Sequence, residues 1–461
     1  MNKALSTPAQ WAQEEFALAQ LGDQRRTDRL VKIAAGLAHS PGGTLPQAFP
    51  EWKELKAAYR FFNQPQASYE RILTPHWGRT LEGCRVPGEY LLIEDTSLLD
   101  YTKHPATEDL GMIGDGGGRG FYLHSTLAVR VEAWDLEQRP EGVVIGLLKQ
   151  QCVNRWGHAS FKEEKRRQRL MRSRMSERWA GLFDEVGGPP EGSQWIYIAD
   201  RESDCYETIE RCQRRGVDFL IRACQNRRLA EGEACLREAV AKAPVLGRMR
   251  VELRGQSGQS ARQATVEARG ARLFLRGPWR PGGRRPDFAV NVVEVREVEV
   301  PAGAEPLCWI LLSSLPCERW AEVQRLVGRY TARWLVEEYH KALKSGTRVE
   351  QSQLERAYRL ESLVAVLALV AVRLLNTKLL ARGRPESYEA AENFGPEMLR
   401  LLDKKLGEPK GGWTNRNLIR SLAKLGGFIG RKSDGEPGWQ TIWRGWQRLI
   451  WMCEGVNLIE S

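Results

Sequence analysis

The chain has 461 residues, more than one hydrophobic core usually organises, so about two to four domains are expected. With 42% hydrophobic and 28% charged residues, the composition is that of a folded globular protein and excludes a largely disordered chain. The formal net charge of +11 indicates a polyanionic partner, and nucleic acid suits such a chain better than a membrane surface.

The cysteines and the apolar segments indicate the cellular compartment in which the protein is expected to work. The nine cysteines, scattered from Cys84 to Cys453, lack the spacing of a disulfide framework or a zinc site, which favours the reducing cytoplasm. The first residues lack the apolar segment of a signal peptide. The apolar run Leu363–Val372 is too short to span a bilayer, so we expect a buried helix and no membrane partner.

The first predicted unit, residues 1–70, is a small basic helical domain. One helix is expected to end at Gly22, and Asp23 is the predicted N-cap of a second helix that stops at the Pro41-Gly42-Gly43 break. Three basic residues, Arg25, Arg26 and Arg29, share one face of that second helix.

From about residue 88 the hydrophobic period changes to that of strands. EYLLIEDTSLLDY is predicted to be a buried strand with its polar end at Asp95, and SQWIYIAD a second strand that ends at Asp200. FYLHSTLAVRVEAW, GVVIGLLKQ and DFLIRA are further strands, and residues 161–181 form a strongly basic helix. Residues 71–225 therefore predict the first part of an α/β core with a mixed sheet.

An insertion of antiparallel strands is predicted over residues 226–304, where alternating runs such as RMRVELR lie between Pro, Gly and Arg clusters. The core returns over residues 305–380 with the strand LCWILLSS and one long helical stretch from Cys317 to Gly346. Residues 381–461 are a helical tail. Three tryptophans share a helical face there and belong either to the tail's own core or to an interface: Trp439, Trp443 and Trp446.

Carboxylates stand at the predicted polar ends of two buried strands, Asp95 and Asp200. Mg²⁺ is held by few protein carboxylates and keeps positions open for water and phosphate. Two such ions roughly 4 Å apart can serve an in-line phosphoryl displacement. An Asp that follows an apolar strand is also an ordinary turn former, so composition alone leaves both interpretations open.

A third acid, Glu337, stands in a stripe of Tyr, Arg and Lys on the long helix. The stripe has spacings of 3, 4, 4 and 3 residues, which places all its members on one face: Tyr330, Arg333, Glu337, Lys341 and Lys344. Such a face suits an acid that binds metal while cations hold phosphates on either side. A solvated face with ion pairs four residues apart would have the same spacing.

These segments resemble the DDE transposases of the insertion-sequence-four family, especially those of the transposon-five (insertion sequence fifty) type. IEDTSLLDY, YIADRESD and RYTARWLVEEYHKALKSG carry the resemblance, and the last segment matches the family's Tyr-(2)-Arg-(3)-Glu-(6)-Lys motif at every position. LGDQRRTDRL, AAYRFF and LGGFIG extend it along the chain. The resemblance implies an RNase H-like core with Asp95, Asp200 and Glu337 as catalytic metal ligands, an all-β insertion, and flanking helical domains, of which the carboxy-terminal one dimerises.

The resemblance also implies a chemistry. In such cut-and-paste transposases, water nicks one strand at each transposon end, and the freed 3′-hydroxyl attacks the opposite strand to form a hairpin. A second water then opens the hairpin, and the 3′-hydroxyl joins target DNA. The implied cofactor is Mg²⁺, two ions per site, with Mn²⁺ as a substitute. The implied partners are double-stranded DNA of the ends and the target and, in the synaptic complex, a second copy of the chain, in a bacterial cytoplasm at the nucleoid.

Further DNA contacts follow from the resemblance. Trp309 matches the aromatic plate on which a flipped base rests, although on an apolar strand it would by itself be read as core. The implied contacts to DNA are Tyr330, Arg333 and Lys344 around the distortion, Arg222 on a phosphate, and Arg25, Arg26 and Arg29 on the transposon end. Lys341 joins them on the same helical face.

Several alternatives remain at the level of sequence. A metal-dependent nuclease or resolvase on the same scaffold would cut without joining, and a DNA-binding regulator would predict damaged acids, whereas all three are intact. Glu202 and Asp204 lie close enough to Asp200 to be alternative ligands. Arg201 either steadies the site or pairs with one of them, and His124 is expected to be structural.

Overall fold

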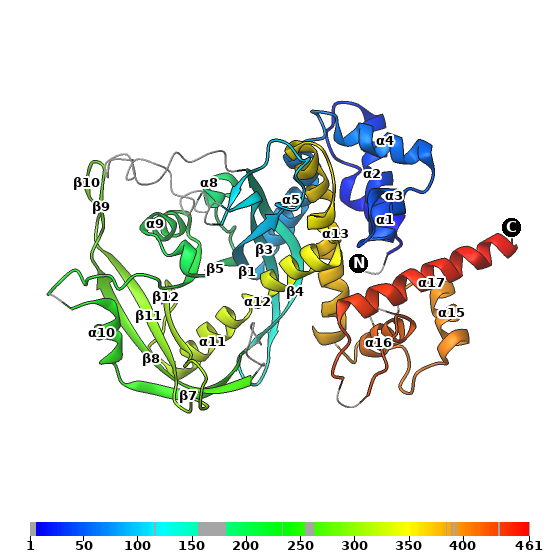
Figure 1. Cartoon of the computed structure of the whole chain (residues 1–461). Helices are drawn as coiled ribbons and strands as arrows, with labels where there is room; N and C mark the ends of the chain where they lie inside the picture. Colours follow the sequence, from blue (N-terminus) through cyan, green and yellow to red (C-terminus); the bar gives the residue numbers. More distant parts are fainter. Residues whose placement is uncertain are drawn as a thin grey trace.

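The computed structural model describes residues 6–460 except 115–116, 155–180, 233, 254–261, 384, 389–390, 392–393 and 432–433. A ten-stranded sheet runs through the larger part of the molecule, and helical regions lie beside it at one end (Figure 1). The strongly basic helix predicted for residues 161–181 lies outside the described residues apart from its last residue.

One half of the sheet has the RNase H-like strand order β4-β3-β1-β5-β6. β1 pairs antiparallel with β3 and parallel with β5, so the mixed sheet is confirmed. The strands that build this half are β1 (Gly88–Asp100), β2 (Gly111–Ile113), β3 (Gly118–Trp134), β4 (Pro140–Asn154), β5 (Ser193–Ala199) and β6 (Asp218–Arg222). Short helices α8 (Leu182–Val186) and α9 (Tyr206–Arg215) and the turn η2 (Arg201–Ser203) lie between them in the chain.

The insertion extends the same sheet instead of forming a separate one, because β12 pairs antiparallel with β6. Its strands are β7 (Val245–Leu253), β8 (Arg262–Leu275) and β11 (Phe288–Glu297), with the small hairpin β9 (Trp279–Arg280) and β10 (Gly283–Arg284). The predicted returning strand of the core, β12 (Cys308–Ser313), pairs with β11 and so joins the insertion to β6. The expectation of an all-β insertion is wrong in one respect, since α10 (Leu236–Ala241) is helical. Leu236 and Val240, four residues apart, are both fully buried, which gives this turn an apolar face.

The amino-terminal region is helical as predicted, with α1 (Pro8–Phe16), α2 (Gln24–His39), α3 (Leu45–Ala48), α4 (Trp52–Phe62) and α5 (Tyr69–Arg85). The Asp23 side chain accepts the Arg25 backbone N–H, which confirms Asp23 as the N-cap of α2. The first helix stops at Phe16 and does not reach Gly22. Side chains of α2 satisfy the backbone beyond it, because Thr27 donates to the Ala19 carbonyl and Arg26 to the Leu21 carbonyl.

The predicted long helix over residues 317–346 is divided. α11 (Trp320–Thr331) is followed by a turn at Ala332 and Arg333, then by α12 (Trp334–Lys341) and a π-helical turn η3 (Ala342–Gly346). π-turns inside helices often occur at functional sites. The short turn η4 (Val349–Gln351) completes the segment.

Helix α13 (Ala357–Gly383) packs against α2, α4 and α5, against β4, and against α16 and α17, so it connects the amino-terminal helices, the core and the tail (Figure 1). The predicted buried helix at Leu363–Val372 is confirmed, but it extends over Ala357–Leu380, which is long and apolar enough by composition to cross a membrane. Its burial is that of a core helix, because 83% of its most apolar part lies inside the protein.

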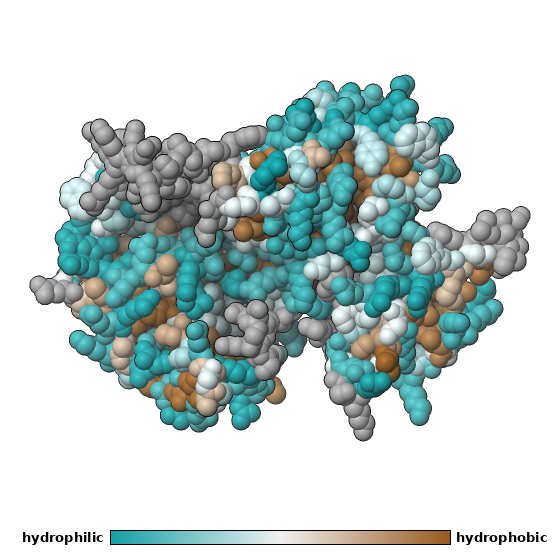
Figure 2. All heavy atoms as spheres, viewed as in Figure 1, coloured by the Kyte–Doolittle hydropathy of each residue, from teal (hydrophilic) through white to brown (hydrophobic). Residues whose placement is uncertain are grey.

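The tail consists of α15 (Pro396–Leu406), α16 (Asn415–Leu425) and α17 (Trp439–Glu460). Trp443 and Trp446 are buried, and the Arg373 guanidinium of α13 lies over both rings at 5.8 and 5.9 Å. These two tryptophans therefore belong to a core shared with α13. The face of the molecule seen in Figure 2 is mainly hydrophilic, with apolar residues in small patches.

Candidate active site

Asp95 and Asp200 are brought together by the pairing of β1 with β5. These strands are parallel and adjacent, with Ile93 beside Ile198, and two residues further on each strand leads to its aspartate. The prediction that β1 ends at Asp95 is wrong, because β1 continues to Asp100. The antiparallel partner β3 sustains it as far as the Asp100–Gly120 pair.

Asp95 lies on the face of β1 that packs against α12. Leu91 and Ile93, which share its face by alternation, belong to the larger apolar core. Burial raises the pKa of Asp95 to about 7, with smaller contributions from Asp200 and Glu337, while Arg333 and the Thr96 N–H act in the opposite direction. The influence of both other acids on Asp95 indicates that the three carboxylates converge on one site.

Glu337 reaches the site from α12, which packs on β1 and β3. Its carboxylate forms an ion pair with Arg333, one turn earlier on the same face. Arg333 Nη1 also lies 3.5 Å from Asp95 Oδ2, so the guanidinium stands between the two acids. Burial alone would lower the pKa of Arg333, but Glu337, Tyr330, Asp95 and Asp200 outweigh it and raise that pKa.

The residues present fit a divalent cation by their chemistry. Carboxylate oxygens are the ligands that Mg²⁺ prefers, and Asp200 and Glu337 both add to the rise in the pKa of Asp95 that burial mainly causes. Within the described residues, no three His, Cys, Asp or Glu side chains are already arranged to hold a metal ion. Arg333 instead supplies the positive charge between Asp95 and Glu337.

Beside the acids lies a cluster of Trp309, Tyr330 and Arg222 from β12, α11 and β6. The rings of Trp309 and Tyr330 meet edge to face with centroids 5.1 Å apart, and Trp309 is only half-buried. Arg222 donates to the Cys308 carbonyl at 3.3 Å. Burial lowers the pKa of Arg222 and raises that of Tyr330, which Arg333 and Arg222 partly offset.

The two lysines of the stripe differ in their surroundings. Lys341 is exposed at the end of α12. Lys344 lies in the π-turn with Nζ 3.5 Å from Glu350 Oε1, and the same oxygen of Glu350 accepts the Asp100 N–H at 3.0 Å. The stripe therefore continues from the acids to the end of β1, although it spans two helices and a π-turn.

Sequence reasoning missed Glu94, which is 2% exposed on the opposite face of β1 from Asp95. Its carboxylate accepts hydrogen bonds from Tyr197 and from Ser203 Oγ (2.7 Å), and His124 Nε2 lies 3.4 Å away. Strand alternation is the signal that could have separated it from Asp95. His124, with its pKa lowered by burial, belongs to this buried network.

The two acids considered as alternatives to Asp200 differ in their contacts. The buried Asp204 accepts the backbone N–H of Cys224 (2.6 Å) and Gln225 (3.0 Å) and pairs with Arg227 Nη1 at 2.5 Å, so it stabilises a loop. Glu202 stays beside the site, since burial and Asp200 raise its pKa.

The three arginines of α2 divide between internal and exposed positions. Arg25 is exposed, whereas Arg26 donates to the Leu21 carbonyl at 2.9 Å and Arg29 forms an ion pair with Glu54 of α4. Arg26 and Arg29 thus have structural contacts in addition to any contact with DNA.

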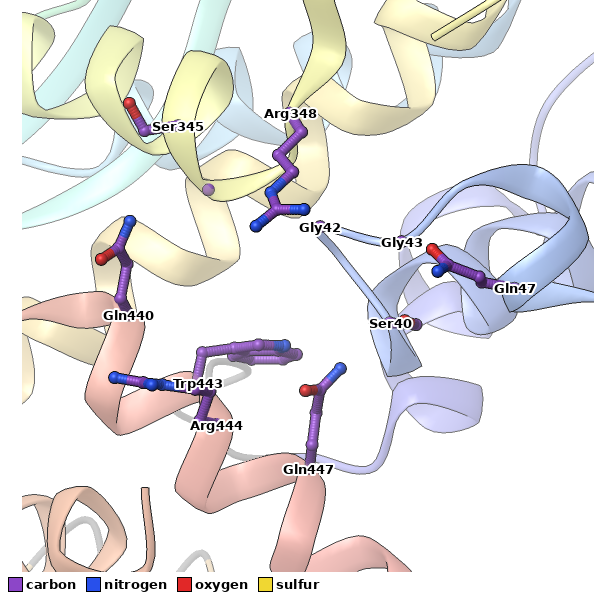
Figure 3. Close-up of a pocket in the computed structure, with 11 residues that line it drawn as sticks. Ser40, Gly42, Gly43, Gln47, Ser345, Arg348, Gln440, Trp443, Arg444 and Gln447 are labelled. Atoms are coloured by element: carbon purple, nitrogen blue, oxygen red, sulfur yellow. The ribbon is translucent and has the colours of Figure 1, made fainter. Parts of the chain in front are cut away.

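A groove of about 420 Å³ lies between the amino-terminal region, the π-turn and α17 (Figure 3). Arg348 and Arg444 line it, and none of the described residues that line it is acidic. Trp443 Nε1 is buried there without a hydrogen-bond partner among the described residues, and Figure 3 shows the nitrogen-bearing edge of its ring toward the 40–43 segment. The described residues that line it are Ser40, Gly42, Gly43, Gln47, Ser345, Gly346, Arg348, Gln440, Trp443, Arg444 and Gln447.

Three segments of the chain match models of known families. Residues 8–67 match the model described as transposase DNA-binding, residues 194–373 the transposase DDE domain, and residues 369–461 the transposase Tn5 dimerisation domain. The second segment includes Asp200 and Glu337. Asp95 precedes it in the chain and joins it through the pairing of β1 with β5.

Proposed function

The chain belongs to the DDE transposases of the Tn5 type, metal-dependent enzymes of DNA cleavage and strand transfer, and from this premise we propose that Asp95, Asp200 and Glu337 form its single catalytic site. The observation that carries the proposal is the convergence of the three acids, in which Asp200 and Glu337 both act on the pKa of Asp95. Arg333 lies between Asp95 and Glu337, so a positive charge is stabilised at this position by the two carboxylates.

DDE domains use divalent metals, generally Mg²⁺; we propose two ions, with Mn²⁺ as a substitute, held by these three carboxylates. Bound there, the ions would activate the attacking oxygen and stabilise the leaving oxygen of an in-line displacement. The protein's own part is to orient the carboxylates, since Thr96 N–H fixes Asp95 Oδ1 at 3.0 Å and Glu202 N–H fixes Asp200 Oδ1 at 2.9 Å. Arg333 would move from the acids to a phosphate.

The proposed course has four steps at this one site. Water cleaves one strand at the transposon end, and the released 3′-hydroxyl attacks the opposite strand, which closes a hairpin and frees the flanking DNA. A second water opens the hairpin, and the 3′-hydroxyl then attacks a target phosphodiester, which releases one target 3′-hydroxyl for each bond formed. Tyr330, Arg222, Lys341 and Lys344 would hold the phosphates on either side.

The test is incubation of the purified protein with its own transposon-end DNA, target DNA and Mg²⁺, with nicked, hairpin and joined products resolved on a denaturing gel. We expect all three species in succession. Nicked and joined products without a hairpin would contradict the hairpin route, and nicking without joining would indicate a nuclease.

Trp309 is expected to act at the hairpin step. A base lifted out of the stack would rest on its half-exposed ring, and stacking of this kind contributes about 1–3 kcal/mol, roughly a 5- to 150-fold change in rate. Trp309→Ala should therefore slow hairpin formation by that factor and leave the first nick unchanged, as measured by product time courses. Trp309→Phe is the matched control, which should keep the plate; an equal loss of nicking in Trp309→Ala would contradict a step-specific role.

The groove of Figure 3 is proposed to carry phosphates of the bound DNA, because its lining, as far as the structure describes it, includes Arg348 and Arg444 and no acid. Changing both arginines to Ala should reduce the slope of log affinity against log salt by about 1 per lost phosphate contact. Titration of fluorescent end DNA at several salt concentrations measures this slope. Arg319→Ala is the control, since that exposed residue pairs with Glu322 on α11; an unchanged slope in the double variant would remove the groove from the DNA path.

The carboxy-terminal match supports dimer formation, and we propose that the dimer is the synaptic complex in which two ends are held. Trp443 and Trp446 are buried within the chain, whereas Trp451, further along α17, is 57% exposed and suits such a contact. A transposase that acts on DNA is expected to be soluble and cytoplasmic, and we propose that it associates with the nucleoid when bound.

A further inference from the structure

A buried chain of polar side chains connects α5 to the candidate active site. Tyr69 donates from its hydroxyl to Gln150 Oε1 at 2.7 Å. The Gln150 amide nitrogen lies 2.9 Å from Ser125 Oγ and 2.7 Å from the Tyr339 hydroxyl. All four side chains are at most 3% exposed, so none of these groups can exchange its partner for bulk water.

The donor and acceptor groups of these side chains determine which of them donates each hydrogen bond. Because Gln150 Oε1 accepts from Tyr69, the Gln150 NH₂ group faces Ser125 and donates to it. The Ser125 hydroxyl is then left with its own proton for His340 Nε2, 3.1 Å away. If Nε2 accepts, the single proton of the neutral imidazole is on Nδ1.

His340 Nδ1 faces Asp95 Oδ2 at 3.8 Å, and the same oxygen lies 3.5 Å from Arg333 Nη1. We propose that His340 is a positioning residue, fixed by Ser125 and Gln150 in its Nδ1–H tautomer, that holds the Asp95 carboxylate in place for a divalent cation. The inference rests on the proposed function, in which Asp95 is a metal ligand. At 3.8 Å the two atoms are beyond hydrogen-bond distance, so the proposal requires the Asp95 carboxylate to approach the ring when the cation takes the place of Arg333.

A neutral donor suits this position. A ring that accepts a hydrogen bond from Ser125 at Nε2 and donates from Nδ1 has one proton and no positive charge, so it would not repel a cation. Arg333 differs, because its charge competes with the cation for the same oxygen. Hydrogen bonds to metal-ligating side chains typically change metal affinity by about 10- to 100-fold.

Two substitutions of His340 separate the two ring nitrogens. The amide nitrogen of Asn lies near the position of Nδ1, and that of Gln near the position of Nε2. We expect His340→Asn to keep Mn²⁺ affinity within about 3-fold of the native protein, and His340→Gln to lower it by about 10- to 100-fold. Mn²⁺ binding is measured by electron paramagnetic resonance in the absence of DNA, and the Mg²⁺ midpoint for cleavage is measured alongside.

Two results would overturn the proposal. If both variants kept the Mn²⁺ affinity of the native protein, His340 would have no role in cation binding. If both lost the same amount of affinity, His340 would contribute by packing alone. Glu337→Gln is measured in parallel. If it still cleaves DNA, the proposed active site is wrong; if it does not, and the two His340 variants bind Mn²⁺ alike, only the positioning role is wrong.

The tautomer can be observed directly, because the chain has only six histidines. Protein labelled with ¹⁵N-histidine gives long-range ¹⁵N–¹H correlations that distinguish the two neutral tautomers, and His340→Gln identifies the signal. The Nδ1–H pattern is the expected result, with its loss in Ser125→Ala. An Nε2–H pattern in the native protein would overturn the assignment.

Discussion

Glu337→Gln is expected to abolish both DNA nicking and strand transfer while transposon-end binding persists. The substitution keeps the shape of the side chain and removes the charge that would hold a cation, and loss of that stabilisation, about 4 kcal/mol or more, corresponds to a rate reduction on the order of 10³-fold. Product formation under saturating end DNA and Mg²⁺ measures the rate, and a mobility-shift titration measures binding.

The neighbouring acid provides the matched control. Glu338 forms an ion pair with Lys378 of α13. Glu338→Gln is expected to lower thermal stability, since it removes the negative charge from an ion pair with the buried Lys378, but to preserve the rate per folded molecule. If Glu338→Gln abolished cleavage and Glu337→Gln did not, the assignment of the third ligand would be reversed.

Cation affinity is expected to fall steeply with pH below neutrality. Asp95 has a pKa of about 7 in the cation-free fold, so below pH 7 its carboxyl is protonated and must lose a proton for metal to bind. Affinity should therefore decrease by about tenfold for each pH unit below 7, roughly 100-fold between pH 7 and 5, and be independent of this group above pH 7. Mn²⁺ titration of the protein without DNA over pH 5 to 8 gives the measurement.

Glu361 of α13 offers a control with the same titration range. Burial, together with Glu70, raises its pKa to about 7, yet it does not belong to the candidate site. Glu361→Gln should leave the pH dependence of Mn²⁺ affinity intact, whereas Asp95→Asn should remove it along with most of the affinity. A flat affinity between pH 5 and 7 in the native protein would show that Asp95 is not a ligand.

Most elements of the fold followed from local periodicity. Apolar runs predicted β1 and β5, alternation predicted the strands of the insertion, and Asp23 marked the start of α2. The errors lie where distant segments satisfy the backbone. β1 continues past Asp95 because β3 pairs with it, and α1 ends early because side chains of α2 take up the carbonyls beyond it.

The candidate site was predictable in its residue types but not in its present arrangement. The spacing of Tyr330, Arg333 and Glu337 on one face pointed to the third acid, and the structure brings Arg333 between that acid and Asp95. The roles of Glu94 and Asp204 could not be predicted, because their partners, such as Tyr197 and Arg227, are determined by packing.

The sequence by itself determined which residues could carry the chemistry, because strand alternation and helical spacing decide the face on which each side chain lies. Only the tertiary structure decided which of them act together. The pairing of β1 with β5 brings Asp95 beside Asp200, α12 packs across β1 and brings Glu337, and the burial produced by that packing raises the pKa of Asp95 to about 7. Proximity and burial arise from contacts between segments more than a hundred residues apart, which no local pattern contains.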